Sequence, residues 1–144
     1  MLSVARLGVG GRGQVTRRFV ICIVDDDEAV RNALARLMKA HGHIVWAFDS
    51  GESLMSSEHR AGADCLIADV QMGGMTGFEL YEQLLASGFP TPTILITGHP
   101  EEAARQQALE RGVACYLAKP FSEDELLECI HLAIEGAEAK NRPQ

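Results

Sequence analysis

Residues 21–31 read ICIVDDDEAVR, an apolar run that ends in three aspartates and a glutamate. A short run that is apolar throughout is typical of a strand covered on both faces. Carboxylates that lie this close together repel one another, and the repulsion falls only where water, a helix N-terminus or a cation offsets it. The stretch therefore predicts a buried strand whose carboxyl end requires a positive counter-charge.

Four more apolar runs follow along the chain, and segments with helical spacing separate them. The five runs are FVICIV (19–24), HIVWAF (43–48), DCLIAD (64–69), PTILIT (92–97) and VACYLA (113–118). Apolar residues at helical intervals, such as Leu34, Leu37 and Met38, predict an amphipathic helix between two runs. The alternation predicts an α/β fold, with helices on both faces of a parallel sheet. The segment from Glu52 to about Arg60 has the weakest helical pattern.

Local signals mark the expected helix boundaries. Glycines stand where three helices are expected to stop, at Gly42, Gly88 and Gly112. Two pairs have the spacing of capping boxes, Thr76 with Glu79 and Ser122 with Glu125. Pro100, followed by Glu101 and Glu102, predicts a first helical turn, because proline presets φ and acids favour the positive end of the helix dipole.

The 144 residues have room for one domain, and their composition of 47% hydrophobic and 23% charged residues is ordinary for a soluble protein. No apolar run approaches the ~20 residues of a membrane span. Residues 1–18 carry four arginines and no acid, so the rest is more acidic than the net charge of -7 indicates. We expect a flexible basic extension (1–18), a domain (19–137) and a polar tail (138–144), with no direct nucleic-acid binding and no membrane contact.

The cysteines and histidines show no strong metal-binding spacing. The four cysteines lie mostly inside apolar runs and form no C-x-x-C pair, at Cys22, Cys65, Cys115 and Cys129. This pattern predicts buried reduced thiols and a cytoplasmic location. The five histidines are expected in loops or on the surface, at His41, His43, His59, His99 and His131.

The ends of the runs carry the side chains with chemistry. In an open α/β sheet, ligands collect outside the carboxyl ends of the strands, where strand order reverses. The first run ends in Asp25 and Asp26, the third in Asp69, the fourth in Thr97 and the fifth in Lys119. With a 2-1-3-4-5 order the three aspartates would meet. A hard divalent cation, Mg²⁺, is the counter-charge that suits such oxygen ligands.

The same residues predict phosphoryl transfer. Thr97 and Lys119 would supply a hydroxyl donor and a fixed positive charge to phosphoryl oxygens. Asp69 is the best candidate nucleophile, since a carboxylate can form an acyl phosphate and the first-strand pair is better placed to hold metal. Each feature alone has a plain explanation, such as an aspartate run that caps a helix. Their occurrence together at four of five strand ends favours the chemical interpretation.

The stretches VDDDEAVR, LIADVQMGGMTGFEL, ILITGH and YLAKPF resemble the receiver domain of bacterial two-component response regulators, in the order and at the separations of that family. The likeness runs from about Phe19 to Ala137. It implies a flavodoxin-like doubly wound five-stranded parallel sheet of order 2-1-3-4-5. It also implies a signalling domain, not an enzyme with a separate substrate, which takes a phosphoryl group from a sensor histidine kinase or a phosphotransfer protein.

By this resemblance Asp69 is the phosphoacceptor. Asp26 would contact Mg²⁺ directly and Asp25 through water, while Asp69 and the backbone carbonyl of Gln71 would complete the protein ligands. Lys119 would pair with the phosphoryl oxygens, and the peptide bond between Lys119 and the following proline is expected to be cis.

Thr97 and Tyr116 match the switch pair of the family. After phosphorylation of Asp69, the Thr97 hydroxyl would bond a phosphoryl oxygen and the Tyr116 ring would rotate from solvent into the vacated space. The changed surface, along the fourth helix, fifth strand and fifth helix, would engage a downstream protein, a missing output domain or a second copy of the chain. The plain alternative for Tyr116 is an aromatic ring that covers the sheet edge.

The sequence departs from the family after Asp69-Val-Gln-Met, where Gly73 and Gly74 replace the usual proline. Glycines loosen the backbone, so we expect an altered phosphoryl lifetime or a mobile loop without loss of the chemistry.

Two other functions stay open at this point. In a haloacid dehalogenase-type phosphatase, Asp25 and Asp27 would be nucleophile and general acid, but that family needs a later acidic pair and has no use for Asp69. In a pseudo-receiver, the domain would bind partners without being phosphorylated. Because only EGAEAKNRPQ follows Ile134, the sequence also allows either a stand-alone receiver or a chain cut at a linker.

Overall fold

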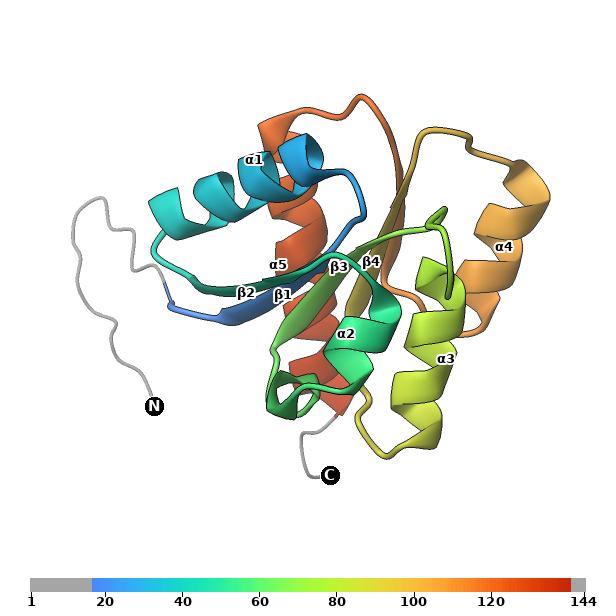
Figure 1. The fold of residues 1–144 in the computed structure, drawn as a ribbon, viewed down its shortest axis with the longest axis horizontal. Coiled ribbons are helices and arrows are strands. Elements are labelled where there is room, and N and C mark those ends of the chain that lie inside the picture. The colour runs from blue at the N-terminus through green and yellow to red at the C-terminus, as the bar shows by residue number, and fades with distance from the viewer. Residues whose placement is uncertain (1–16, 141–144) are drawn as a thin grey trace.

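The computed structural model describes residues 17–140, in which strands and helices alternate (Figure 1). The strands are β1 (Val20–Val24), β2 (Ile44–Phe48), β3 (Cys65–Asp69), β4 (Thr93–Thr97) and β5 (Cys115–Ala118). The helices are α1 (Glu28–Ala40), α2 (Gly51–Met55), the 3-10 helix η1 (Glu58–Arg60), α3 (Gly77–Ala86), α4 (Glu102–Glu110) and α5 (Glu123–Lys140). None of these helices combines the length and the apolar character that crossing a bilayer demands.

The two expected flanking segments have different outcomes. The expected basic extension lies outside the described residues, apart from Arg17 and Arg18. The polar tail was expected to begin at residue 138, but α5 continues through Lys140. The helix continues because residues 135–140, EGAEAK, include strong helix formers such as alanine, glutamate and lysine, and a polar composition does not end a helix.

The five strands form one parallel sheet in the order β2-β1-β3-β4-β5, which confirms the predicted doubly wound α/β fold. β1 lies between β2 and β3, and Ile21 pairs with Val45 on one side and with Cys65 on the other. The chain winds in one direction from β1 to β2 and in the other from β3 to β5. The carboxyl ends of β1 and β3 therefore meet at the point where strand order reverses.

Alternate residues of the central strands enter two apolar cores. Ile21 and Ile23 pack beneath α1 and α5, whereas Cys22 and Val24 pack beneath α2, α3 and α4. Figure 1 shows the same division of the helices between the two faces of the sheet. Residues of β3 and β4 are buried along their whole length. Burial on both faces gives β1, β3 and β4 their continuous apolar sequences.

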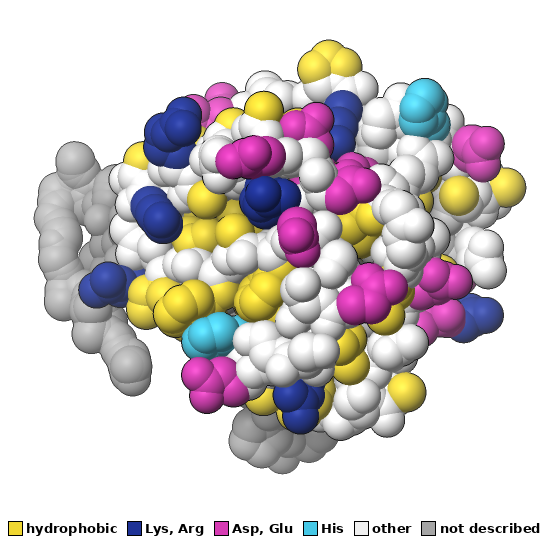
Figure 2. Space-filling model, in the orientation of Figure 1, with side chains coloured by type: hydrophobic (Ala, Val, Ile, Leu, Met, Phe, Trp, Pro, Cys, Tyr) yellow, Lys and Arg dark blue, Asp and Glu magenta, His cyan; other side chains and the backbone are white. Residues whose placement is uncertain are grey.

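The edge strand β2 differs from the central strands, although its sequence is equally apolar. Ile44 is 38% exposed and Trp46 is 41% exposed. The Trp46 ring stacks on His59 of η1, with ring centroids 3.8 Å apart. Figure 2 shows apolar side chains gathered on the β2 side of the molecule. An apolar run thus did not guarantee burial on both faces, because an edge strand has a sheet neighbour on one side only.

Most of the predicted helix boundaries are confirmed. The Thr76 hydroxyl accepts from Glu79 N, and Thr76 N donates to the Glu79 carboxylate, which completes a capping box at α3. Ser122 and Glu125 form the same reciprocal pair before α5. A glycine with a left-handed backbone follows each of three helices: Gly42 (φ +89°) after α1, Gly88 (φ +88°) after α3 and Gly112 (φ +106°) after α4.

The start of α4 was predicted wrongly, and the weakest helix is short. Pro100 lies before the helix, and Glu101 is its N-cap with an extended backbone of φ -129° and ψ 131°. The first turn therefore begins at Glu102. The segment from Glu52 to Arg60 divides into the five-residue α2 and η1, which accounts for its weak periodicity.

All four cysteines are free thiols. Cys22 and Cys65 are buried, while Cys115 and Cys129 are half-buried, so the prediction of burial holds fully for two of them. Burial raises the pKa of Cys22 to about 11 and also raises the pKa of Cys65. The histidines are exposed or half-buried, as expected.

Candidate functional site

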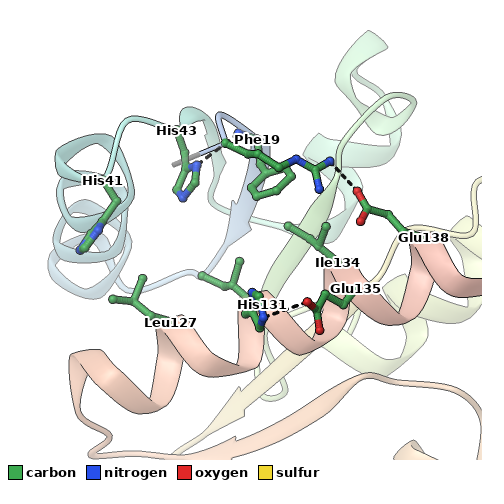
Figure 3. A pocket seen from close by; sticks show the side chains of 10 residues that line it. Phe19, His41, His43, Leu127, His131, Ile134, Glu135 and Glu138 are labelled. Atoms are coloured by element: carbon green, nitrogen blue, oxygen red, sulfur yellow. Dashed lines mark hydrogen bonds and ion pairs between the residues drawn. The ribbon is translucent and has the colours of Figure 1, made fainter. Parts of the chain in front are cut away.

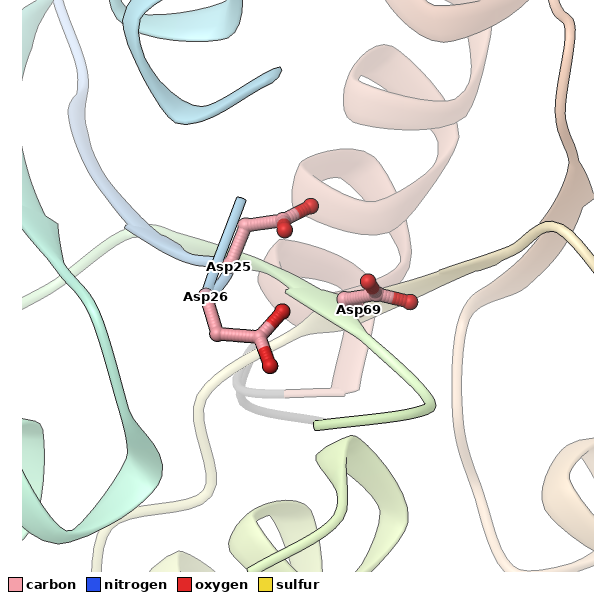
Figure 4. Close-up of side chains that lie close together, drawn as sticks. All are labelled: Asp25, Asp26 and Asp69. Carbon is pink, nitrogen blue, oxygen red and sulfur yellow. The ribbon is translucent and has the colours of Figure 1, made fainter. Parts of the chain in front are cut away.

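Asp25, Asp26 and Asp69 come together at the carboxyl edge of the sheet (Figure 4). One oxygen from each carboxylate lies within 4.8 Å of the others. Asp25 and Asp26 directly follow β1, and Asp69 is the last residue of the neighbouring β3. Asp25 and Asp69 are buried, whereas Asp26 is exposed. The cluster is therefore open to solvent beside Asp26.

Asp25 has an incomplete set of hydrogen bonds. Its side chain is fully buried, and its Oδ1 atom accepts a hydrogen bond of 2.9 Å from Asp27 N. Its Oδ2 atom is buried without a hydrogen-bond partner. Burial raises the pKa of Asp25, opposed by the bond from Asp27 N, and the negative charge of Asp69 raises it further. A buried carboxylate oxygen without a donor is unfavourable, and a cation removes that cost.

The donor set fits a hard cation. The three carboxylates offer oxygen ligands. Asp25 Oδ2 accepts no hydrogen bond, so it is free to face a cation. Mg²⁺ prefers oxygen ligands, is commonly held by one or two carboxylates, and retains several waters. The exposed side of the cluster at Asp26 leaves room for such waters. The residues therefore fit the predicted Mg²⁺ site.

Lys119 brings a positive charge to the cluster. Its Nζ atom lies 3.4 Å from Asp69 Oδ2 and 3.7 Å from Asp25 Oδ2. Lys119 follows β5, and the peptide bond between Lys119 and Pro120 is cis, as expected. The Lys119 side chain is 26% exposed, so its ammonium group can meet a ligand that approaches from solvent. The cluster thus combines three carboxylates with one amine.

Thr97 and Tyr116 occupy different environments. Thr97 is the last residue of β4, is fully buried, and follows Ile96, which pairs with Asp69. Its Oγ1 atom accepts a hydrogen bond of 2.9 Å from His99 N. Tyr116 is half-buried and packs against the core beneath α2, α3 and α4. The structure therefore brings Thr97 to the edge that holds Asp69, while Tyr116 lies two positions before the end of β5.

The loop after Asp69 is held at both ends. Gln71 N donates to Asp69 Oδ1 at 3.3 Å, which ties the backbone at Gln71 to the Asp69 side chain. Gly77 N donates to Val70 O at 3.1 Å and closes the loop where α3 begins. The Gln71 side chain is exposed. We call residues 70–76 the β3–α3 loop.

Two residues that support the site were missed in the sequence. A Cβ atom at Gly77 would lie 2.4 Å from the carbonyl oxygen of Asp69, so only glycine lets α3 approach so closely. Arg31 donates from Nη1 to the Asp25 carbonyl at 2.8 Å. A glycine at the first position of a capped helix was a usable signal for Gly77. Arg31 had no comparable signal, because its partner is a backbone atom.

Asp27 has a structural role. Its Oδ1 atom accepts hydrogen bonds from Ala29 N and Val30 N, so Asp27 is the N-cap of α1. The plain explanation of the aspartate run is thus right for one of its three members. The phosphatase alternative required Asp27 as a general acid, but the Asp27 side chain is engaged by the two backbone amides that it caps. That alternative loses its support.

A separate pocket lies near the beginning of β1 (Figure 3). It is lined by residues of α5, by His41 and His43, and by Phe19. Phe19 directly precedes β1, whereas Asp25 directly follows β1. Phe19 N donates to His43 Nδ1 at 3.2 Å, and His131 pairs with Glu135 at 3.0 Å. Because these groups bond to one another at the opposite end of β1, the pocket belongs to a different part of the surface.

Comparison with known proteins decides the family. The sequence model of the response regulator receiver domain matches residues 21–131. The chain belongs to the response regulator receiver family. The response regulator protein TodT of Pseudomonas putida is 37% identical over 128 residues, which cover 89% of this chain and 56% of TodT. The transcriptional regulatory protein FixJ of Bradyrhizobium diazoefficiens is 32% identical over 124 residues, covering 86% of this chain and 60% of FixJ.

A solved structure agrees with this membership. The crystal structure of FixJ-N superposes on the receiver with a TM-score of 0.74 and 31% identity, and it covers 81% of this chain and 94% of that one. The receiver spans less than two thirds of the length of TodT and FixJ. The similarity therefore extends to the receiver part of those regulators, and it leaves out more than a third of each.

Proposed function

We propose that this receiver accepts a phosphoryl group on Asp69 from the phosphohistidine of a sensor histidine kinase or a phosphotransfer protein. The observation that supports this proposal is the convergence of Asp25, Asp26 and Asp69 at one sheet edge, with Lys119 Nζ 3.4 Å from Asp69 Oδ2. A nucleophilic carboxylate, a cation site and a fixed amine are the groups that such a transfer requires.

In the proposed step, a carboxylate oxygen of Asp69 attacks phosphorus. The new P–O bond forms as the P–N bond of the phosphohistidine breaks, and the donor imidazole keeps the electron pair and takes up a proton from solvent. Mg²⁺, held by Asp25, Asp26, Asp69 and the carbonyl of Gln71, would neutralise charge between carboxylates and phosphoryl oxygens when bound. Lys119 would neutralise a further phosphoryl oxygen.

Phosphorylation is proposed to change the surface through Thr97 and Tyr116. To bond a phosphoryl oxygen, the Thr97 hydroxyl would give up the hydrogen bond that it accepts from His99 N. The Tyr116 ring, now half-buried, would move further inward. The partner on the changed surface of α4, β5 and α5 would be a downstream protein, an output domain or a second receiver. The free thiols support a location in the reducing cytoplasm, where this exchange of the phosphoryl group would take place.

Incubation with acetyl phosphate and Mg²⁺, followed by intact-mass measurement, tests the proposal. We expect the wild type to gain one phosphoryl group and Asp69→Asn to gain none. Asp27→Asn is a matched control from the same acidic run, because the Asp27 side chain caps α1, asparagine also caps helices, and the bond from Asp27 N to Asp25 is a backbone bond that the substitution retains. Its phosphorylation is expected to match the wild type.

The same experiment separates the receiver from a pseudo-receiver. A wild-type protein that stays unmodified at saturating Mg²⁺ would support a module that binds partners without phosphorylation. Removal of the metal with EDTA is expected to suppress the gain in mass. A gain that persists both in EDTA and in Asp69→Asn would contradict the assignment of Asp69.

A further inference from the structure

We propose that Glu52, in the first turn of α2, is a positioning residue for the phosphorylation of Asp69. Its carboxylate holds the β3–α3 loop, which begins directly after Asp69. The inference rests on the proposed function and adds to it a residue from an element that carries none of the reacting groups.

One hydrogen bond joins Glu52 to the loop. Glu52 Oε2 accepts from Met75 N at 3.1 Å, and these two residues are 23 positions apart in the sequence. The loop is also attached at Gln71 N, which donates to Asp69 Oδ1, and at Thr76, which caps α3. Glu52 therefore holds the loop between its two ends. A hydrogen bond to an ionised acceptor is stronger than one between neutral groups.

Gly74 makes room for the Glu52 carboxylate. A Cβ atom at residue 74 would lie 2.8 Å from Glu52 Oε2 and 3.4 Å from Glu52 Cδ, and the three nearest atoms all belong to Glu52. At Gly73 a Cβ atom would meet nothing within 4 Å. The two adjacent glycines thus have different roles, and only Gly74 is matched to Glu52.

The turn that carries Glu52 is anchored. The Ser50 hydroxyl accepts from Ser53 N at 3.0 Å and caps α2. Leu54 is 1% exposed and belongs to the core beneath α2, α3 and α4. Met75 packs over Gly51, where a Cβ atom would lie 2.9 Å from the Met75 sulfur. Because α2 is fixed in this way, Glu52 can restrain a loop that lacks the usual proline.

The restraint acts on the segment that bears the expected carbonyl ligand of Mg²⁺, Gln71. A loop held at Met75 samples fewer conformations between Gln71 and α3, so the carbonyl and the Asp69 carboxylate keep their relative positions. Loss of the Glu52 contact is therefore expected to change how long the phosphoryl group stays on Asp69, without removing any reacting group.

Four variants test the inference through two measurements. Hydrogen exchange of the Met75 amide is measured in the unphosphorylated protein, and the lifetime of the Asp69 phosphate is measured after acetyl phosphate treatment. We expect Glu52→Ala and Gly74→Ala each to speed Met75 exchange and to change the lifetime by about two- to fivefold. Glu52→Gln, whose amide oxygen accepts a hydrogen bond without the charge, is expected to change both measurements less than Glu52→Ala does. Gly73→Ala is expected to stay close to the wild type.

The double variant sharpens the test. Since the atoms nearest to a Cβ at residue 74 belong to Glu52, adding Gly74→Ala to Glu52→Ala is expected to change neither measurement further. Faster exchange with an unchanged lifetime in Glu52→Ala would reduce Glu52 to a structural contact and overturn the positioning role. Unchanged exchange of the Met75 amide in Glu52→Ala would show that Glu52 does not hold this amide in solution. Failure of the wild type to accept phosphate would refute the proposed function instead, a result distinct from both.

Discussion

The interior of β3 and its carboxyl end follow opposite rules, although they are neighbours on one strand. Ile67 is fully buried in an apolar core beneath α1 and α5. Two residues later, Asp69 is also buried, but it lies beside Asp25 and Lys119. The interior is packed from apolar side chains, whereas the end gathers carboxylates that the proposed Mg²⁺ would neutralise when bound. The proposed phosphoacceptor therefore lies on the same buried strand as the core, at the end where the neighbouring side chains are charged.

The largest expected effect concerns the interior. Ile67→Ala removes a fully buried side chain, so we expect the free energy of unfolding to fall by about 2–5 kcal/mol, measured by urea denaturation in EDTA. The increase in the free energy of unfolding on addition of Mg²⁺ is expected to be the same in this variant as in the wild type. A loss below about 0.5 kcal/mol would contradict the description of β3 as a tightly packed strand.

Gly77→Ala disturbs the boundary between interior and end. Its Cβ atom would lie 2.4 Å from the Asp69 carbonyl oxygen and 3.1 Å from Leu95, so α3 must shift. We expect a loss of about 1–3 kcal/mol in thermal or urea unfolding, with reduced phosphorylation of Asp69. Gly136→Ala in α5 is the matched control, since a Cβ there meets nothing within 4 Å. That control is expected to raise stability by about 0.5–1 kcal/mol. Equal effects of the two alanines would refute the close approach at Gly77.

Asp25→Asn is expected to act in the opposite direction from the core substitution. Without divalent cations, removal of a buried charge whose Oδ2 lacks a hydrogen bond is expected to raise stability by about 1 kcal/mol at neutral pH. Added Mg²⁺ is expected to raise the melting temperature of the wild type more than that of the variant. Equal Mg²⁺ shifts in the two proteins would contradict a role for Asp25 in holding the cation.

The pH dependence of this difference follows from the raised pKa of Asp25. As pH rises above the ordinary carboxyl value, the unfolded chain releases this proton before the folded chain does, so the folded state of the wild type loses stability. Below that value both states are protonated and the contribution vanishes. Melting curves in EDTA are therefore expected to show the gain from Asp25→Asn growing from about pH 4 toward neutrality. A gain that is constant with pH would rule out this electrostatic cause.

The smallest expected effect concerns the β3–α3 loop. Gly73 does not have a left-handed φ, and space is open around it. Gly73→Pro is expected to change the free energy of unfolding by no more than about 1 kcal/mol, through the reduced entropy of the unfolded chain. It is expected to slow amide exchange in the loop and to alter the lifetime of the Asp69 phosphate. Identical lifetimes in Gly73→Pro and the wild type would show that the missing proline has no consequence.

Much of the fold followed from local sequence because its determinants are local. The signals that act over a few residues predicted the elements correctly. They are the apolar runs, the glycines after helices such as Gly42, and the capping box at Thr76. The start of α4 was predicted wrongly, and the exposure of β2 was not predicted. The first depends on the backbone angles of Glu101, and the second depends on which strand has a neighbour on both sides.

The sequence by itself determined that carboxylates end the first and third apolar runs and that a lysine ends the fifth, because the hydrophobic pattern marks where each strand stops. Only the tertiary structure decided that Asp25 is fully buried with an oxygen lacking a hydrogen bond, that Asp27 is occupied as a helix cap, and that Glu52 reaches Met75. These are contacts of single atoms between segments distant in the chain. Their distances depend on how helices pack on the sheet, which no local pattern encodes.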